Sequence, residues 1–396
     1  MAFNVDAATA RYIDSLGPAA LQKAHDYTVG KEWMILWGLI VSAIVTWLIV
    51  RSGVLDDLEA KLQRRGLALR AFVIGAVYLV ISSILTLPWS LYADWWREKS
   101  YGRTSQPLGD FLFQGGIALV IGALLGGIFL MLLYLLIRKA GRTWWLWSGG
   151  LTAIVLAIVM LLSPVLIEPL FNKYEPVPPG KVRDAVVEMA GRAGVPADKV
   201  YMYNGSRQSN NFTANAGGVG STARVAISDV AFKNASLEEV RAVTGHEIGH
   251  YVLKHSYWGI LFFSILAIVL FWLADRLFPR FARFFGSRAS VADPAGVPVL
   301  LFIASFFGIL ASPLTNTFSR TLESQADLYS LQTENLPDAL SSSLVKTAEY
   351  RYPRPGKFEE IVFYDHPSVE ARVHRAMEWK ATHPANPGHA VPETAQ

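Results

Sequence analysis

The chain has 396 residues, of which 52% are hydrophobic and 17% charged, and its mean hydropathy is +0.30. This composition is too apolar for an ordinary soluble protein of this length. The chain has no cysteine, which excludes disulfides and thiolate metal sites. The net charge is only +4, and basic residues gather in short loops, so the charge pattern indicates membrane topology rather than nucleic-acid binding.

Six apolar runs are each long enough to cross a hydrocarbon core of about 30 Å as a helix. None of them contains Asp, Glu, Lys, Arg or His, which argues against an ion-coupled transporter. Residues 1–32 precede these runs, and we expect them to form an amphipathic lead-in. They lack the basic region of a signal peptide. The six runs are Trp33–Val50, Ala71–Tyr92, Phe111–Ile137, Trp144–Ile167, Ser256–Ala274 and Ala295–Ser319.

A polar insert lies between the fourth and fifth runs. Its pattern predicts a helix over Lys181–Ala193, a strand over Lys199–Tyr203 and a glycine-rich loop or hairpin over Ser206–Asp229. The sequence thus predicts a mainly α membrane protein with about six transmembrane helices and a small α+β catalytic domain. We expect an N-terminal membrane domain (1–167), a catalytic insert (168–255), two further spans (256–319), a C-terminal catalytic segment (320–381) and a mobile tail (382–396).

A His-Glu-x-x-His motif, from His246 to His250, lies near the end of the insert. On a helix, positions i and i+4 share one face, so both imidazoles can bind the same ion. Glu247 projects from a neighbouring face, where it can act as a general base on a water, as in zinc metalloproteases. Two histidines at this spacing also occur by chance, so the motif alone does not complete a site.

The helix that carries the motif has a recognisable start. Ser236 is suited to cap it, and Glu239, three residues later, completes a capping box. Gly249 lies inside the helix and costs about 1 kcal/mol relative to alanine. We therefore expect another element or a substrate to approach the backbone closely at this glycine.

Catalytic zinc needs three protein ligands and one open position, so a third ligand is required. Glu323 begins a helical segment just after the sixth run, and two crossings return the chain to the side of the membrane where His250 lies. Asp327 follows one turn later and can accept a hydrogen bond from a ligand histidine, fixing its tautomer. Without the His-Glu motif, a solvated helix of charged residues would be the preferred interpretation of these two carboxylates.

Together, these segments resemble the Ste24 type of peptidase family M48, the CAAX prenyl proteases. The motif His246–His250, the segment Glu323–Asp327 and the segment His366–Arg372 carry the resemblance. Segments 87–92 and 168–173 are also similar to that family, so the resemblance covers nearly the whole chain from the first apolar run to about residue 375.

The resemblance implies one zinc ion per chain, held by the two motif histidines and Glu323, with Glu247 as the base. It also implies a zincin-like catalytic domain and a barrel of membrane helices around a water-filled chamber. Asp327 resembles the carboxylate that supports a ligand, and His366 and Arg372 resemble residues near the substrate carbonyl and the zinc-site glutamate. Eukaryotic members have seven spans, so one helix near the N-terminus is missing here.

The substrate-binding strand departs from the family pattern. That strand usually carries Asn-Ala before a glycine, and an ungapped match places Thr213 and Ala214 there, with Gly218 after them. Asn211 or Asn215 is an alternative for the missing asparagine. We expect an extended peptide to pair with the edge of this hairpin by strand addition.

The sequence therefore predicts a membrane-embedded zinc metalloendopeptidase that hydrolyses extended or short polypeptides. The alternative is a catalytically silent scaffold, or a chaperone-like peptide binder, with the same fold. We expect an integral, multi-pass protein of a bacterial cell membrane. Its expected partners are a peptide or protein substrate and the lipid bilayer, with no nucleic acid. The sequence does not indicate the oligomeric state or a prenylated substrate.

The side of the membrane that the catalytic face occupies stays open. Loops 51–70, 138–142 and 276–288 are richer in Lys and Arg than the opposite segments, which places the catalytic face outside. The resemblance places it in the cytosol instead.

Overall fold

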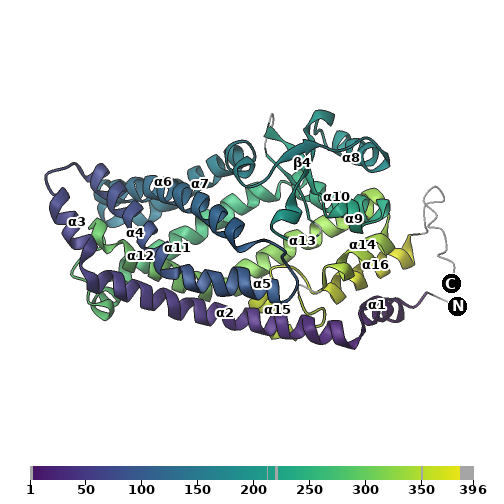
Figure 1. Cartoon of the computed structure of the whole chain (residues 1–396), viewed down its shortest axis with the longest axis horizontal. Coiled ribbons are helices and arrows are strands. Elements are labelled where there is room, and N and C mark those ends of the chain that lie inside the picture. The colour runs from purple at the N-terminus through teal and green to yellow at the C-terminus, as the bar shows by residue number, and fades with distance from the viewer. Residues whose placement is uncertain (1–2, 212, 219–221, 349–350, 384–396) are drawn as a thin grey trace. The chain divides into compact units, whose positions relative to one another are not determined.

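The computed structural model describes residues 3–211, 213–218, 222–348 and 351–383 (Figure 1). The chain divides into two compact units, and each unit is assembled from separate parts of the sequence. The predicted mobile tail lies outside the described residues from position 384 onward. The first unit comprises Met1–Glu32, Pro164–Ser256 and Ser312–Gln396, and the second comprises Trp33–Ser163 and Tyr257–Ala311.

The second unit is built mainly from long apolar helices, to which the short polar helices α3 and α5 are added. Glycines let two of them, α4 and α6, approach closely: a Cβ at Gly75 would lie 2.9 Å from Leu130 Cδ1, and one at Gly126 would lie 2.6 Å from Leu79 Cδ1. Small residues allow such packing where lipid gives no hydrophobic driving force between helices. The helices are the later part of α2 (Gly17–Ser52), α3 (Val54–Leu62), α4 (Leu67–Ser90), α5 (Arg97–Ser100), α6 (Leu108–Ala140), α7 (Trp144–Leu162), α11 (His255–Phe285) and α12 (Val297–Leu310).

The predicted membrane runs are helical in the structure. Among the described residues, four helical segments are long and apolar enough to cross a membrane, or five if one bent pair counts as a single span. The segment Leu108–Leu170 contains the third and fourth predicted runs, as α6 and α7. The sixth run is divided at Ala311 between α12 and α13 (Ser312–Glu334). A mainly α membrane protein is thus confirmed.

The first unit contains a four-stranded sheet with the order β1-β2-β4-β3. Strand β2 runs parallel to β4, while β1 and β3 are antiparallel to their neighbours, so β3 forms one edge. The predicted strand and returning hairpin are confirmed as β2, β3 and β4. Strand β1 was not predicted, because a three-residue strand with a Glu and a Pro carries no strand pattern. The strands are β1 (Tyr174–Pro176), β2 (Val200–Tyr203), β3 (Ala214–Gly217) and β4 (Arg224–Ser228).

Helices surround this sheet and form two apolar clusters. In one cluster, Val186 and Met189 of α8 pack with Val225 and Ile227 of β4 and with Val240 of α10. The other cluster joins α1, α14 and α16, so the predicted lead-in is helical and packs within this unit. The helices are α1 (Val5–Asp14), α8 (Lys181–Arg192), α9 (Ala231–Asn234), α10 (Leu237–Val252), α13, α14 (Pro337–Lys346), α15 (Lys357–Phe363) and α16 (Val369–Thr382).

Candidate active site

Helix α10 begins with the predicted capping box. Ser236 Oγ accepts a hydrogen bond from the Glu239 backbone N–H at 3.2 Å, and Glu239 Oε2 accepts one from the Ser236 N–H at 2.8 Å. The same carboxylate also accepts from Ser342 Oγ and Lys346 Nζ of α14, each at 2.6 Å. The start of α10 is therefore capped, and the Glu239 carboxylate also binds it to α14 through side-chain hydrogen bonds.

Two glycines bring α10 and α13 into close contact. A Cβ at Gly249 would lie 3.1 Å from Tyr329 Cβ and 3.2 Å from Ala326 Cα, and one at Gly245 would lie 3.0 Å from Ser330 Oγ. Ser330 Oγ also donates a hydrogen bond to a backbone carbonyl of α10 at 2.7 Å. The predicted close approach at Gly249 is thus confirmed, and α13 is the element that makes it.

Three side chains of these two helices point at one position. His246 Nε2 and His250 Nε2 lie 3.1 Å apart, and Glu323 places Oε2 3.2 Å from the first and Oε1 3.4 Å from the second. The three residues each offer a ligand atom, and these atoms lie within 4.8 Å of one another. The predicted third ligand therefore meets the motif histidines, although 73 residues separate Glu323 from His250 in the sequence (323 − 250).

The other ring nitrogen of His246 is held by a buried ion pair. His246 Nδ1 lies 2.9 Å from Asp327 Oδ1. Arg372 of α16 donates to both oxygens of that carboxylate, from Nε at 2.8 Å and from a terminal nitrogen at 2.6 Å. A bidentate guanidinium–carboxylate pair fixes both partners, so Asp327 can hold the imidazole in one orientation.

Charge around His246 alters its affinity for protons. Burial disfavours the charged imidazole, but the carboxylates of Asp327 and Glu323 outweigh burial and raise the pKa of His246 to about 10. A metal ion and a proton therefore compete for the same Nε2 atom.

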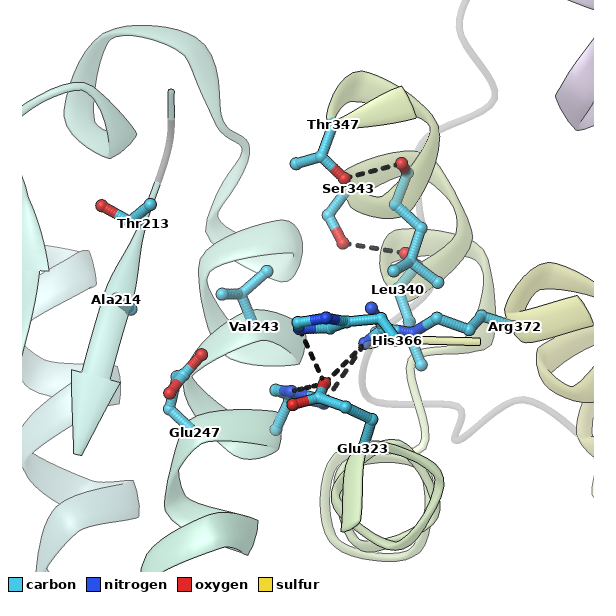
Figure 2. A pocket seen from close by; sticks show the side chains of 12 residues that line it. Thr213, Ala214, Val243, Glu247, Glu323, Leu340, Ser343, Thr347, His366 and Arg372 are labelled. Atoms are coloured by element: carbon cyan, nitrogen blue, oxygen red, sulfur yellow. Dashed lines mark hydrogen bonds and ion pairs between the residues drawn. The ribbon is translucent and has the colours of Figure 1, made fainter. Parts of the chain in front are cut away.

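A pocket of about 220 Å³ opens beside these side chains (Figure 2). Figure 2 shows Glu247 on the side nearest strand β3, across the pocket from Arg372. Burial raises the pKa of the Glu247 carboxyl above its ordinary value. A carboxylate with a raised pKa is a better proton acceptor near neutral pH.

His366 enters the pocket from the segment before α16. Its Nε2 lies 3.3 Å from Glu323 Oε2, and its Nδ1 lies 2.9 Å from Asp365 Oδ1 (Figure 2). Arg351 pairs with the same Asp365 carboxylate. Arg372 adds a second positive group, 3.9 Å from Glu323 Oε2. Both predicted residues thus lie in the pocket, beside the carboxylate of Glu323.

The four predicted substrate-binding residues divide into two pairs. Thr213 and Ala214 line the pocket at the start of strand β3. Asn215, the next residue, points to the opposite face because side chains alternate along a strand. Neither Asn211 nor Asn215 is among the residues that line this pocket.

Three polar residues near the site were not predicted. Asp365 holds His366, His255 contacts the second motif histidine at 2.9 Å, and Gln325 contacts His255 at 3.0 Å. Asp365 directly precedes a predicted site histidine, which is a weak signal at most. The sequence shows no signal that joins Gln325 to His255.

Comparison with known proteins gives matches along nearly the whole chain. Residues 6–173 match the CAAX prenyl protease N-terminal domain, described as five membrane helices, and residues 176–386 match peptidase family M48. An uncharacterised metalloprotease of Bacillus subtilis, YhfN, is 27% identical over 372 residues, covering 91% of this chain and 86% of the relative. The human CAAX prenyl protease 1 homolog is 26% identical, covering 74% and 70%.

A solved structure shares the fold. The crystal structure of S. mikatae Ste24p superimposes with a TM-score of 0.76 at 20% sequence identity, covering 94% of this chain and 95% of that one.

Proposed function

Because this chain belongs to peptidase family M48 and is an integral membrane metalloendopeptidase, we propose that its metal is zinc, held by His246, His250 and Glu323. Two imidazole nitrogens and a carboxylate oxygen are a usual donor set for catalytic zinc, with one position left for water or substrate. Thiolate-bound metals are excluded because the chain has no cysteine.

The donor atoms also support a shared ion rather than mutual hydrogen bonds. Glu323 Oε2 is buried and accepts no well-aligned hydrogen bond from the residues that the structure describes, although the ring nitrogens of His246 and His366 lie within 3.3 Å of it. Buried polar atoms are almost always satisfied, so an oxygen of this kind needs another partner. A metal ion bound between the three ligands would supply it.

The residues around this position have different roles in peptide hydrolysis. When bound, the metal supplies Lewis acidity, which polarises a carbonyl and acidifies water. Glu247 takes a proton from the attacking water and passes it to the leaving amine. Arg372 stabilises negative charge on the carbonyl oxygen through N–H donors beside the ligand Glu323. His366 does the same when both of its ring nitrogens carry hydrogen, because Nδ1 then donates to Asp365 and Nε2 lies beside Glu323.

We propose that the substrate binds in extended form along strand β3. This strand is the edge of the sheet, so its outer N–H and C=O groups can pair with a peptide. Thr213 and Ala214, at its start, lie beside Glu247 in the same pocket. The water-filled chamber predicted for the membrane helices stays a prediction, and it would restrict substrates to short or unfolded chains.

The chain is an integral, multi-pass membrane protein that acts on peptide or protein substrates. We propose the cell membrane of a bacterium as its location, a proposal supported by the extent of the match to the Bacillus subtilis relative. A catalytically silent scaffold is not favoured, since the base and all three ligand side chains are present.

Metal content and peptide cleavage of the purified protein test this proposal together. We expect one zinc per chain by elemental analysis, and cleavage of a quenched fluorescent peptide that stops with chelator and returns with added zinc. In His250→Ala, the zinc should be lost. Wild-type protein that cleaves peptides with no metal, or that binds zinc equally well after His250→Ala, would overturn the assignment.

A further inference from the structure

The second motif histidine has a support of its own, which differs from that of His246. His250 Nδ1 lies 2.9 Å from His255 Nδ1, and the two rings meet edge to face with centroids 4.9 Å apart. On its far side, His255 Nε2 lies 3.0 Å from Gln325 Oε1. A chain of hydrogen bonds therefore runs from Gln325 through His255 to the ligand His250.

The backbone places His255 for this contact. Helix α10 ends at Val252, and Lys254 takes a left-handed conformation with φ of 59° before α11 begins at His255. A positive φ is uncommon for a residue other than glycine. The turn at Lys254 separates α10 from α11, and His255 lies on the ring of His250 with only 4% of its surface exposed.

Donor and acceptor rules fix the direction of the hydrogen bonds. Gln325 Oε1 only accepts, so His255 Nε2 must donate to it. His255 Nδ1 is then the acceptor of a neutral ring, and it receives the N–H of His250 Nδ1. The proton of His250 is thereby kept on Nδ1, which leaves a lone pair on Nε2. The opposite direction would put the proton of His250 on Nε2 and block a metal ion there.

We propose that His255 is a positioning residue that keeps His250 in its metal-binding tautomer, and that Gln325 sets the direction by accepting from His255. The inference rests on the metal site proposed above. Neutral hydrogen-bond partners of a ligand histidine act as carboxylates do, by fixing ring orientation and tautomer. The structural alternative is a buried histidine that only helps to pack the start of α11.

Zinc affinity, measured by chelator competition at one pH, separates these two roles. In His255→Leu, which keeps the volume but removes the acceptor, we expect affinity to fall about tenfold, within the usual range for partners of metal ligands. In His255→Gln, the side-chain oxygen can still accept from His250, so affinity should stay within about threefold of wild type. A packing role predicts no such rescue.

Gln325 gives a second test that does not threaten folding, because it lies on the exposed side of α13. Gln325→Leu should weaken zinc binding, whereas Gln325→Glu keeps an acceptor and should not. Adding Gln325→Leu to His255→Leu should have no further effect, since Gln325 acts only through His255. Additive losses, or His255→Leu with wild-type affinity, would overturn the inference. If His250→Ala also kept its zinc, the metal site itself would be wrong, so the two failures are distinguishable.

Discussion

The two motif histidines lie one helical turn apart but are held by different chemistry. Asp327 and Arg372 form a buried ion pair behind His246, and their residues come from α13 and α16. Behind His250, a neutral imidazole and an amide take that place, and the nearer partner is only five residues away. Charge-assisted hydrogen bonds are roughly twice as strong as neutral ones. The two proposed ligands should therefore respond unequally when their partners are changed.

The largest effect should come from a substitution of Glu247. This residue is held neither by the Asp327–Arg372 ion pair nor by the hydrogen bonds of His255 and Gln325. Glu247→Gln keeps the shape of the side chain but cannot take a proton, so turnover should fall about 10²–10⁴-fold. Zinc affinity should stay at the wild-type value, because both supports are intact. Glu238→Gln, on the first turn of the same helix, is the matched control. Equal peptide hydrolysis by Glu247→Gln and Glu238→Gln would remove the base from the mechanism.

Asp327→Asn should weaken zinc binding by about 10–100-fold, the usual range for partners of metal ligands. The substitution turns the charged support of His246 into a neutral one, so its effect measures what the charge contributes. Thermal unfolding without metal must be measured beside it, because Arg372 loses its buried carboxylate partner. A loss smaller than that of His255→Leu would contradict the ranking of the two supports.

Asp365 supports a histidine that is not among the three proposed ligands. Asp365→Asn weakens the hold on His366, so we expect turnover to fall by about tenfold, at the lower end of such effects. Zinc affinity should not change. Chelator competition and peptide cleavage on the same preparation check both halves of this prediction. A parallel loss of zinc would place His366 in the ligand set instead.

The smallest effect should come from a change in the contact between α10, which carries both motif histidines, and α13, which carries Asp327 and Gln325. Gly249→Ala adds a methyl group 3.1–3.2 Å from atoms of α13. The crowding should offset the gain in helix propensity, leaving this variant about 1 kcal/mol less stable than Gly191→Ala. A Cβ at Gly191, near the end of α8, would meet no atom of the described part of the chain within 4 Å. Denaturant unfolding compares the stabilities of the two variants. Equal stabilities would show that α13 accommodates the added methyl group with no loss of stability.

Local patterns were enough to predict much of the fold. Some features depend only on residues that are close together in the sequence, and the structure confirms them. They are the apolar runs, the capping box at Ser236 and the strand predicted over Lys199–Tyr203. The same holds for the spacing of His246 and His250, because the helix itself fixes their separation. Their roles, and those of the substrate-binding residues on β3, stay predictions until they are tested.

The partners behind His250 could not be predicted in this way, whereas Asp327 was predicted as the partner of a ligand histidine and lies 2.9 Å from His246. Gln325 is far from both His250 and His255 in the sequence. Only the packing of α10 against α13 brings these residues together. Strand β1 pairs antiparallel with β2, a contact that its own three residues did not predict.

The sequence by itself determined the class of protein, its helices and the residue types that can bind a metal, because hydrophobic length and helical periodicity are local properties. The tertiary structure decided which carboxylate meets the two histidines and which partner orients each ring. The contacts of Glu323 with His250 and of Asp327 with His246 join residues more than 70 positions apart, and no local pattern encodes their geometry. His255, in contrast, reaches His250 from only five residues away. The unequal supports of the two histidines thus come from helix packing behind His246 and, behind His250, from the turn at Lys254 together with helix packing.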